Sequence, residues 1–288
     1  MKLCRFGPPG SEKPGLVDAE GSIRDLSGVV PDIGAAEISR AGLARLAAID
    51  PASLPRVAGS PRYGVPVANT RQFIAIGLNY ADHAAESNMP IPAEPVMFTK
   101  AVTCLQGPDD QVTIPRGSTR TDWEVELGIV IGKRASYVTE AEALDHVAGY
   151  CVVHDVSERG FQLDRGGTWD KGKGCPTFGP AGPWLVTADE VGDPQNLSMW
   201  LDVNGRRMQD GSTRTMIFPV SKLVSYLSEF MILEPGDIIT TGTPPGVGMG
   251  QKPDAIYLNP GDVVTLGIEK LGTQRQEFVA WAPMERAA

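Results

Sequence analysis

In residues 121–132, TDWEVELGIVIG, the carboxylates Asp122, Glu124 and Glu126 occupy every second position, and large apolar residues stand between them. Successive side chains of a β-strand point to opposite faces. The alternation therefore predicts a strand with one apolar face and one face that carries three carboxylates. Like charges at this spacing repel each other and weaken a strand. The acidic face therefore requires a partner that compensates its charge.

Short apolar runs of strand length recur from Gln72 onward, separated by turn-rich segments. They include FIAIGLNY, VAGYCVVHD, GPWLVT, LSMWLDVNG, DIITTGT and DVVTLGIE. Few are joined by regular crossover helices, and the clearest helices are YADHAAES, TEAEALDHV and VSKLVSYLSEFM. We therefore predict a β-rich α+β fold rather than a doubly wound sheet. The 33 glycines and 24 prolines indicate long ordered loops, which commonly carry functional sites.

The first 68 residues differ from the rest of the chain in their pattern of predicted elements and turn-forming residues. Their pattern predicts a hairpin at the start, then an Ala/Leu-rich helix over 36–49, and then a stretch punctuated by Pro, Gly and Ser. A chain of 288 residues commonly forms one large domain with a small one. We therefore expect a small N-terminal domain and linker over 1–68 and a larger catalytic domain over 69–288.

Composition excludes several classes of protein. The net charge of −9 argues against nucleic-acid binding, which requires a basic surface. No apolar run approaches the roughly 18 residues of a membrane span. The first residues lack the apolar core of a signal peptide, so a cytoplasmic protein is expected. The four cysteines lie far apart without a C-x-x-C pair, which predicts reduced thiols.

The acidic strand face is a candidate metal site. Side chains at i and i+2 on one face lie about 6.5–7 Å apart, so Glu124 and Glu126 can converge on one Mg²⁺ or Mn²⁺ ion. A solvated strand face is the commoner explanation of an isolated E-x-E. Asp155 is a candidate third ligand, because it follows the apolar strand VAGYCVV directly, although a helix-capping role also suits it.

Two other segments carry groups suited to catalysis. His83 and Glu86 are three residues apart in a predicted helix, so they share a face and suit a general base with its orienting carboxylate, although a surface pair is commoner. Lys171 and Lys173 lie in a stiff loop, where a fixed ammonium stabilises developing negative charge. The loop GVGMG offers backbone N–H groups to an anion, but no helix opens there, which excludes a Rossmann site.

Taken in order, seven segments resemble the fumarylacetoacetate hydrolase superfamily and span about residues 72–268. They are GLNYADHAAE, PVMFTKAVTCLQGPDDQVTIP, DWEVELGIVIGKRA, VAGYCVVHDVSERGFQ, KGKGCPTFGPAGPW, VNGRRMQDGSTRTMIF and LEPGDIITTGTPPGVG. The resemblance implies a mixed β-sheet roll, usually a homodimer, with one Mg²⁺ or Mn²⁺ ion. The residues that it implies are the metal ligands Glu124, Glu126 and Asp155, the water-activating pair His83 and Glu86, and Lys173, Gln162 and Thr243 near the substrate.

Within the superfamily the chain is similar to the acylpyruvate hydrolases that act on 2,4-diketo-3-deoxy sugar acids such as diketo-deoxy-fuconate or -rhamnonate. Similar chains are also called ureidoglycolate lyase. Gly174 and Pro176 depart from the Ser and Asp expected after the loop lysine, which leaves the loop geometry and the substrate open.

The expected reaction is hydrolysis of a C–C bond in a 2,4-dioxo acid, with Arg159 and Lys100 as further candidates for binding the anionic substrate. Oxaloacetate decarboxylation and keto–enol isomerisation need nearly the same groups and stay open as alternatives. A ligand-binding protein without catalytic activity is disfavoured, because the acids, the histidine and the lysine are all present.

Overall fold

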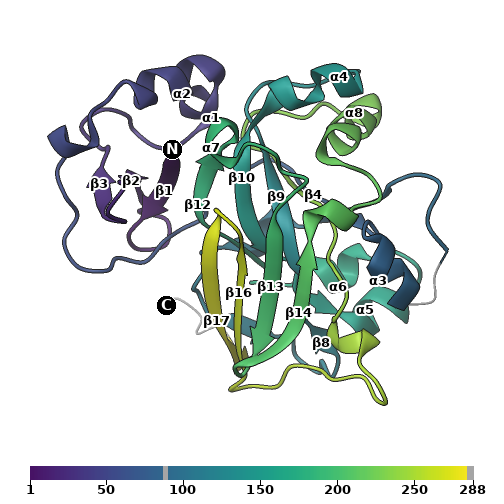
Figure 1. Ribbon diagram of the computed structural model, residues 1–288. Helices are drawn as coiled ribbons and strands as arrows, with labels where there is room; N and C mark the ends of the chain where they lie inside the picture. Colours follow the sequence, from purple (N-terminus) through teal and green to yellow (C-terminus); the bar gives the residue numbers. More distant parts are fainter. Residues whose placement is uncertain (87–89, 284–288) are drawn as a thin grey trace.

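The protein, seen as a computed structural model, is described for residues 1–86 and 90–283 (Figure 1). Within these residues the largest element is a ten-stranded mixed sheet. Its strand order is β3 (Ile23–Asp25), β2 (Lys13–Val17), β1 (Lys2–Phe6), β12 (Gly179–Thr187), β10 (Val147–His154), β9 (Val125–Ile131), β15 (Ile238–Thr240), β4 (Phe73–Gly77) and β5 (Val96–Lys100), and β6 (Leu105–Gln106) pairs with β12.

A five-stranded sheet lies against the large one. Its order is β14 (Arg206–Ser212), β13 (Ser198–Val203), β16 (Val263–Ile268), β17 (Gly272–Ala280) and β7 (Val112–Ile114). Strands β13 and β16 contact β9, and β17 contacts β10 and β12. The apolar residues that alternate along β9, such as Leu127 and Ile129, are fully buried. The predicted β-rich fold is confirmed, and the core lies along β9 and β10.

The helices are short. They are α1 (Ala35–Ile38), α2 (Arg40–Ala47), α3 (Ala81–Glu86), α4 (Glu140–Ala143), α5 (Arg159–Leu163), α6 (Asp170–Lys173), α7 (Ala188–Val191) and α8 (Val220–Phe230). Helix α6 contacts β5 and α5, which brings two site-bearing segments together. No helix among the described residues is long and apolar enough to cross a membrane.

The N-terminal segment continues the large sheet. Strand β1 pairs with β2 as the predicted hairpin, and on its other side it pairs with β12 through Lys2 opposite Val186. The helix predicted over 36–49 forms as two pieces, α1 and α2. Ser39 is extended between them, and its Oγ accepts a hydrogen bond from the N–H of Gly42 at 3.1 Å, so it caps α2.

The strand predicted over 121–132 is interrupted. It forms β8 (Thr121–Asp122) and β9, and β8 pairs with β11 (Ser157–Glu158) while β9 pairs with β10. The register is the same on both sides of the interruption, because Val125 lies opposite His154 and Asp122 lies opposite Ser157. This constant register places Glu124 opposite Asp155, whose N–H donates to the Glu124 carbonyl at 3.0 Å.

Candidate active site

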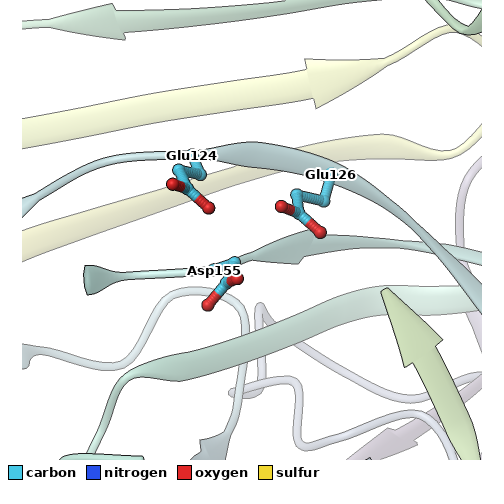
Figure 2. Close-up of side chains that lie close together, drawn as sticks. All are labelled: Glu124, Glu126 and Asp155. Carbon is cyan, nitrogen blue, oxygen red and sulfur yellow. The ribbon is translucent and has the colours of Figure 1, made fainter. Parts of the chain in front are cut away.

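Three buried carboxylates face one common space. Glu124 and Glu126 point to the same face of their strand because they are two residues apart, and Asp155 joins them because it lies opposite Glu124 on the neighbouring strand. Each offers an oxygen, and these three atoms lie within 4.8 Å of one another. Figure 2 shows Glu124 and Glu126 along one segment and Asp155 on the neighbouring one. Glu124 directly precedes β9, Glu126 lies within it, and Asp155 directly follows β10.

This donor set fits a hard divalent cation. Metal–oxygen bonds of about 2.0–2.6 Å allow two ligand atoms of one ion to lie up to about 5 Å apart, which agrees with the observed cluster. Carboxylate oxygens are the ligands that Mg²⁺ and Mn²⁺ prefer. Glu124, Glu126 and Asp155 would hold the ion, with carboxylates supplied by β9, its N-terminal extension and the residue after β10.

Two buried lysines compensate part of the negative charge. Lys173, at the end of α6, donates from Nζ to Glu124 at 2.7 Å and to Asp155 at 2.8 Å. Lys100, at the end of β5, reaches the other oxygen of Asp155 at 2.5 Å. Its Nζ also donates to the carbonyl oxygens of Lys173 and Val156, so Lys100 supports Asp155 from behind.

Glu126 receives hydrogen bonds but no cationic partner in the described structure. Its Oε2 accepts from the hydroxyl of Thr240 and from the N–H of Gly242 at 2.9 Å. Burial and the charges of Asp155 and Glu124 raise the pKa of Glu126 well above its ordinary value. A divalent cation would supply the positive charge that keeps Glu126 ionised.

Arg159 donates three hydrogen bonds, two of them to the acidic segment that carries Asp122 and Glu124. Its Nε donates to Asp122 at 2.8 Å, one Nη donates to Glu124 at 2.7 Å, and the other donates to Oε1 of Gln162 at 3.0 Å. Burial alone would raise the pKa of Glu124, but the charges of Lys173 and Arg159 outweigh it and hold this pKa well below its ordinary value. Glu124 is therefore ionised at neutral pH.

The glycine-rich loop after β15 binds two carboxylates of the protein itself. The N–H groups of Gly248 and Met249 donate to Asp122 at 2.6 and 3.0 Å, and the N–H of Gly246 donates to Glu86 at 3.1 Å. The sequence indicated an anion at this loop but did not identify it. Asp122, noted only as the first acid of the strand, therefore fixes the loop and Arg159 instead of joining the metal cluster.

His83 and Glu86 form the predicted pair on α3. Nδ1 of His83 lies 3.2 Å from Oε2 of Glu86, and this hydrogen bond lowers the pKa of Glu86. An ionised carboxylate accepts, so Nδ1 carries the proton and Nε2 is left as the basic nitrogen. In contrast, Nδ1 of His146 contacts the carbonyl oxygens of Lys133 and Arg134, which indicates a structural role for this histidine.

A cavity of about 110 Å³ brings most of the predicted residues together. Thr243 lines it, and its hydroxyl donates to the carbonyl of Val125 at 2.9 Å. Asp155, Lys100 and Glu86 are not in the lining, but each is hydrogen-bonded to a residue that is. The lining consists of Ile76, Gly77, Leu78, His83, Phe98, Glu124, Glu126, Arg159, Gln162, Leu163, Trp169, Lys173, Gly242, Thr243 and Met249.

Two further sequence expectations concern Lys100 and the cysteines. Lys100 was expected to bind the anionic substrate, but its ammonium is fully engaged behind Asp155 and its side chain is inaccessible. The four cysteines are free thiols, as predicted, and Cys4, Cys104 and Cys151 are buried.

We expect Asp122→Ala to lower the free energy of unfolding by about 3–5 kcal/mol, the usual cost of removing one partner of a buried ion pair. The loss would leave Arg159 and two loop N–H groups without their acceptor. Urea denaturation measures the change. Asp202→Ala, which breaks a surface pair with Arg207, is the matched control and should cost less than about 1 kcal/mol. Equal losses in the two variants would contradict the role given to Asp122.

Comparisons with known proteins agree with this geometry. A curated relative from Burkholderia multivorans, provisionally named a hydrolase, is 63% identical over 276 residues and covers 96% of this chain and 98% of its own. Three solved structures each cover 98% of this chain and 100% of their own. A fumarylacetoacetate hydrolase from Exiguobacterium antarcticum is 35% identical with a TM-score of 0.87. A 5-carboxymethyl-2-hydroxymuconate delta-isomerase from Mycobacterium smegmatis is 30% identical with a TM-score of 0.76.

The third structure is a maleylpyruvate hydrolase from Sphingobium sp. SYK-6 in complex with manganese(II) and pyruvate, 29% identical with a TM-score of 0.80. Residues 72–279 of this chain match the family described as fumarylacetoacetate (FAA) hydrolase, C-terminal. The match covers the strands, helices and loops that form the cavity. The chain belongs to the fumarylacetoacetate hydrolase family.

Proposed function

We propose that this protein is a metal-dependent hydrolase that cleaves a C–C bond of a 2,4-dioxo acid to give pyruvate and a carboxylic acid. One observation carries the proposal: His83, oriented by Glu86, lines the same cavity as Glu124, Glu126 and Lys173. A base for water and a binding site for a cation are therefore directed at one substrate-sized space. The manganese and pyruvate bound by the maleylpyruvate hydrolase support the choice of cofactor and product.

Each residue has a distinct part in this reaction. An ion held by the three carboxylates would supply Lewis-acid polarisation of the 2-oxo group and the adjacent carboxylate. His83 takes a proton from the water that attacks the 4-carbonyl, and Glu86 stabilises the resulting imidazolium. The C3–C4 bond breaks, and its electron pair leaves as a pyruvate enolate. Lys173 stabilises that negative charge, and the proton held by His83 returns to C3.

Keto–enol isomerisation is a second candidate, because a similar solved structure is an isomerase. Oxaloacetate decarboxylation needs the same cation and Lys173. Neither reaction consumes water. Decarboxylation does not require the pair formed by His83 and Glu86, so the presence of that pair in the cavity favours hydrolysis over decarboxylation. Isomerisation transfers a proton and can use the same base, so the reaction products distinguish it from hydrolysis.

A substrate panel tests the proposal. We expect acylpyruvates to be converted to pyruvate and the free acid in the presence of Mg²⁺ or Mn²⁺, and we expect activity to disappear with a chelator and return when the metal is restored. The panel includes oxaloacetate and 2,4-diketo-3-deoxy sugar acids, and products are identified by mass spectrometry. Decarboxylation or isomerisation without any hydrolysis would exclude the proposed reaction.

A further inference from the structure

One side of the cavity is apolar. Its apolar lining residues come from four separate segments of the chain: the end of β4, β5, the stretch from α5 to α6, and the glycine-rich loop. They are Ile76, Leu78, Phe98, Leu163, Trp169 and Met249. None of them belongs to the groups that the proposed reaction uses. They therefore contact a part of the substrate that does not react.

Trp169 is the largest of these residues, and its position is fixed by two neighbours. Its ring packs edge-on against Phe98, with centroids 5.4 Å apart at 63°. It also lies against Gly77, where an added Cβ would come within 2.3 Å of Trp169 Cζ3. Because Gly77 has no side chain, the Trp169 ring can pack directly against the backbone at the end of β4. The Trp169 ring is held as a wall of the cavity.

The apolar side begins next to the reacting groups. Nζ of Lys173 lies 5.2 Å from the centroid of the Phe98 ring, and the same Nζ contacts Glu124 and Asp155. A substrate whose oxo acid end lies at the carboxylate cluster would therefore extend the substituent on its C4 carbonyl along Phe98 toward Trp169. This substituent differs from one 2,4-dioxo acid to another.

The cations of the cavity are already paired within the protein. Each of the three nitrogens of Arg159 donates to a side chain, and Lys173 bridges two carboxylates. A second carboxylate on the acyl group would meet apolar side chains at Trp169 and Phe98. A polyhydroxylated chain would lose hydrogen bonds to water there without replacement. The chemistry of this wall favours a hydrocarbon substituent.

The same wall separates the cavity from a neighbouring groove on the surface. Trp169 and Phe98 line both spaces. The other residues of the groove, which lie beyond the wall, are Val96, Met97, Thr99, Gly167, Thr168 and Asp170. Removal of the Trp169 ring would join the groove to the cavity, which makes Trp169 a limit on the length of the acyl group.

We propose that Trp169, packed on Gly77 and Phe98, forms the end wall of an acyl pocket. This pocket selects 2,4-dioxo acids whose C4 carbonyl carries a short alkyl or single-ring aryl substituent. This inference rests on the proposed hydrolase function. It disfavours the polyhydroxylated sugar acids that the sequence resemblance suggested, as well as dicarboxylic substrates.

The test compares kcat/KM for four classes of 2,4-dioxo acid: short alkyl or aryl, long alkyl, polyhydroxylated and dicarboxylic. We expect the wild-type protein to prefer short alkyl or aryl substrates by about tenfold or more, the usual discrimination of an apolar pocket. Trp169→Ala should raise the ratio of long-alkyl to short-alkyl kcat/KM by about tenfold or more, because the groove becomes accessible. Trp169→Leu, which keeps an apolar side chain on Gly77, should give an intermediate ratio.

Trp281→Ala is the matched control, because Trp281 is 44% exposed, stacks on Arg116 and does not line the cavity. Its ratio should equal that of the wild-type protein. Preference for polyhydroxylated or dicarboxylic acids, or an unchanged ratio in both Trp169 variants, would overturn the inference while leaving the hydrolase function intact. If no acid is hydrolysed, the proposed function fails. The selectivity of the pocket is then decided by calorimetric affinities of the same four classes of acid for the wild-type protein and the Trp169 variants.

Discussion

We expect His83→Ala to lower the rate of acylpyruvate hydrolysis by about 10²- to 10⁴-fold relative to the wild-type protein, because this is the usual contribution of general-base catalysis. The imidazole is the basic group of the pair, and Glu86 acts only through it. Divalent-metal affinity should stay at the wild-type value, because neither residue belongs to the carboxylate cluster. Steady-state kinetics and calorimetric titration of Mn²⁺ measure the two properties separately.

His146→Ala is the control for this prediction, since His146 is buried, does not line the cavity, and in the described structure forms side-chain hydrogen bonds only to backbone carbonyls. It should keep most of the hydrolytic activity. Any decarboxylation of oxaloacetate should survive in His83→Ala, because that reaction needs no activated water, but it should fall in Lys173→Ala. Full hydrolytic activity in His83→Ala would show that another group activates the water.

Glu126→Gln is expected to weaken binding of Mg²⁺ or Mn²⁺ by more than about 100-fold, since loss of partners that only support a metal ligand already costs 10- to 100-fold. The same change should raise the free energy of unfolding of the metal-free protein. Glutamine keeps an acceptor for Thr240 and Gly242, and it replaces an acid whose pKa is raised on folding by burial, Asp155 and Glu124, which at neutral pH destabilises the folded state. Affinity and stability should thus change in opposite directions.

Glu158→Gln is the control for this prediction, and its effects on stability and metal affinity should differ from those of Glu126→Gln. Glu158 is also a buried acid, but it caps α5 by accepting from the N–H of Phe161 and also accepts from the N–H of Arg120. Its replacement should lower stability and leave metal affinity unchanged. Metal binding that is equally tight in Glu126→Gln and the wild-type protein would remove Glu126 from the ligand set.

The carboxylate cluster was largely predictable from local pattern. Alternation in residues 121–132 places Glu124 and Glu126 on one face, and Asp155 follows directly after an apolar run. What local pattern does not contain is the pairing of the two strands, which puts Asp155 opposite Glu124. The apolar run before Asp155 made it a candidate third ligand, and the resemblance to a known family implied all three acids as one ligand set.

The roles of the charged residues around the cluster were less predictable, because each depends on a partner far along the chain. Lys100 ends an apolar strand and meets Asp155 across 55 positions, and Asp122 meets the glycine-rich loop across 126. Trp169 was missed for the same reason, since its contacts with Gly77 and Phe98 join separate segments. Glycine within the strand FIAIG was the available signal, because glycine in a strand often marks the close approach of another group.

Because the register is the same on both sides of the β8–β9 interruption, the backbone pairing of the two segments is what brings the ligands of the cation site together. A slip of one residue in this pairing would turn Glu124 and Glu126 away from Asp155 and would also expose the apolar face of β9. Correct folding of the core and assembly of the ligand set are therefore a single event. The pair formed by His83 and Glu86 comes instead from the short helix α3, outside that ladder. Exchange of this helix alone would redirect the chemistry of the protein while its ability to hold a cation persisted.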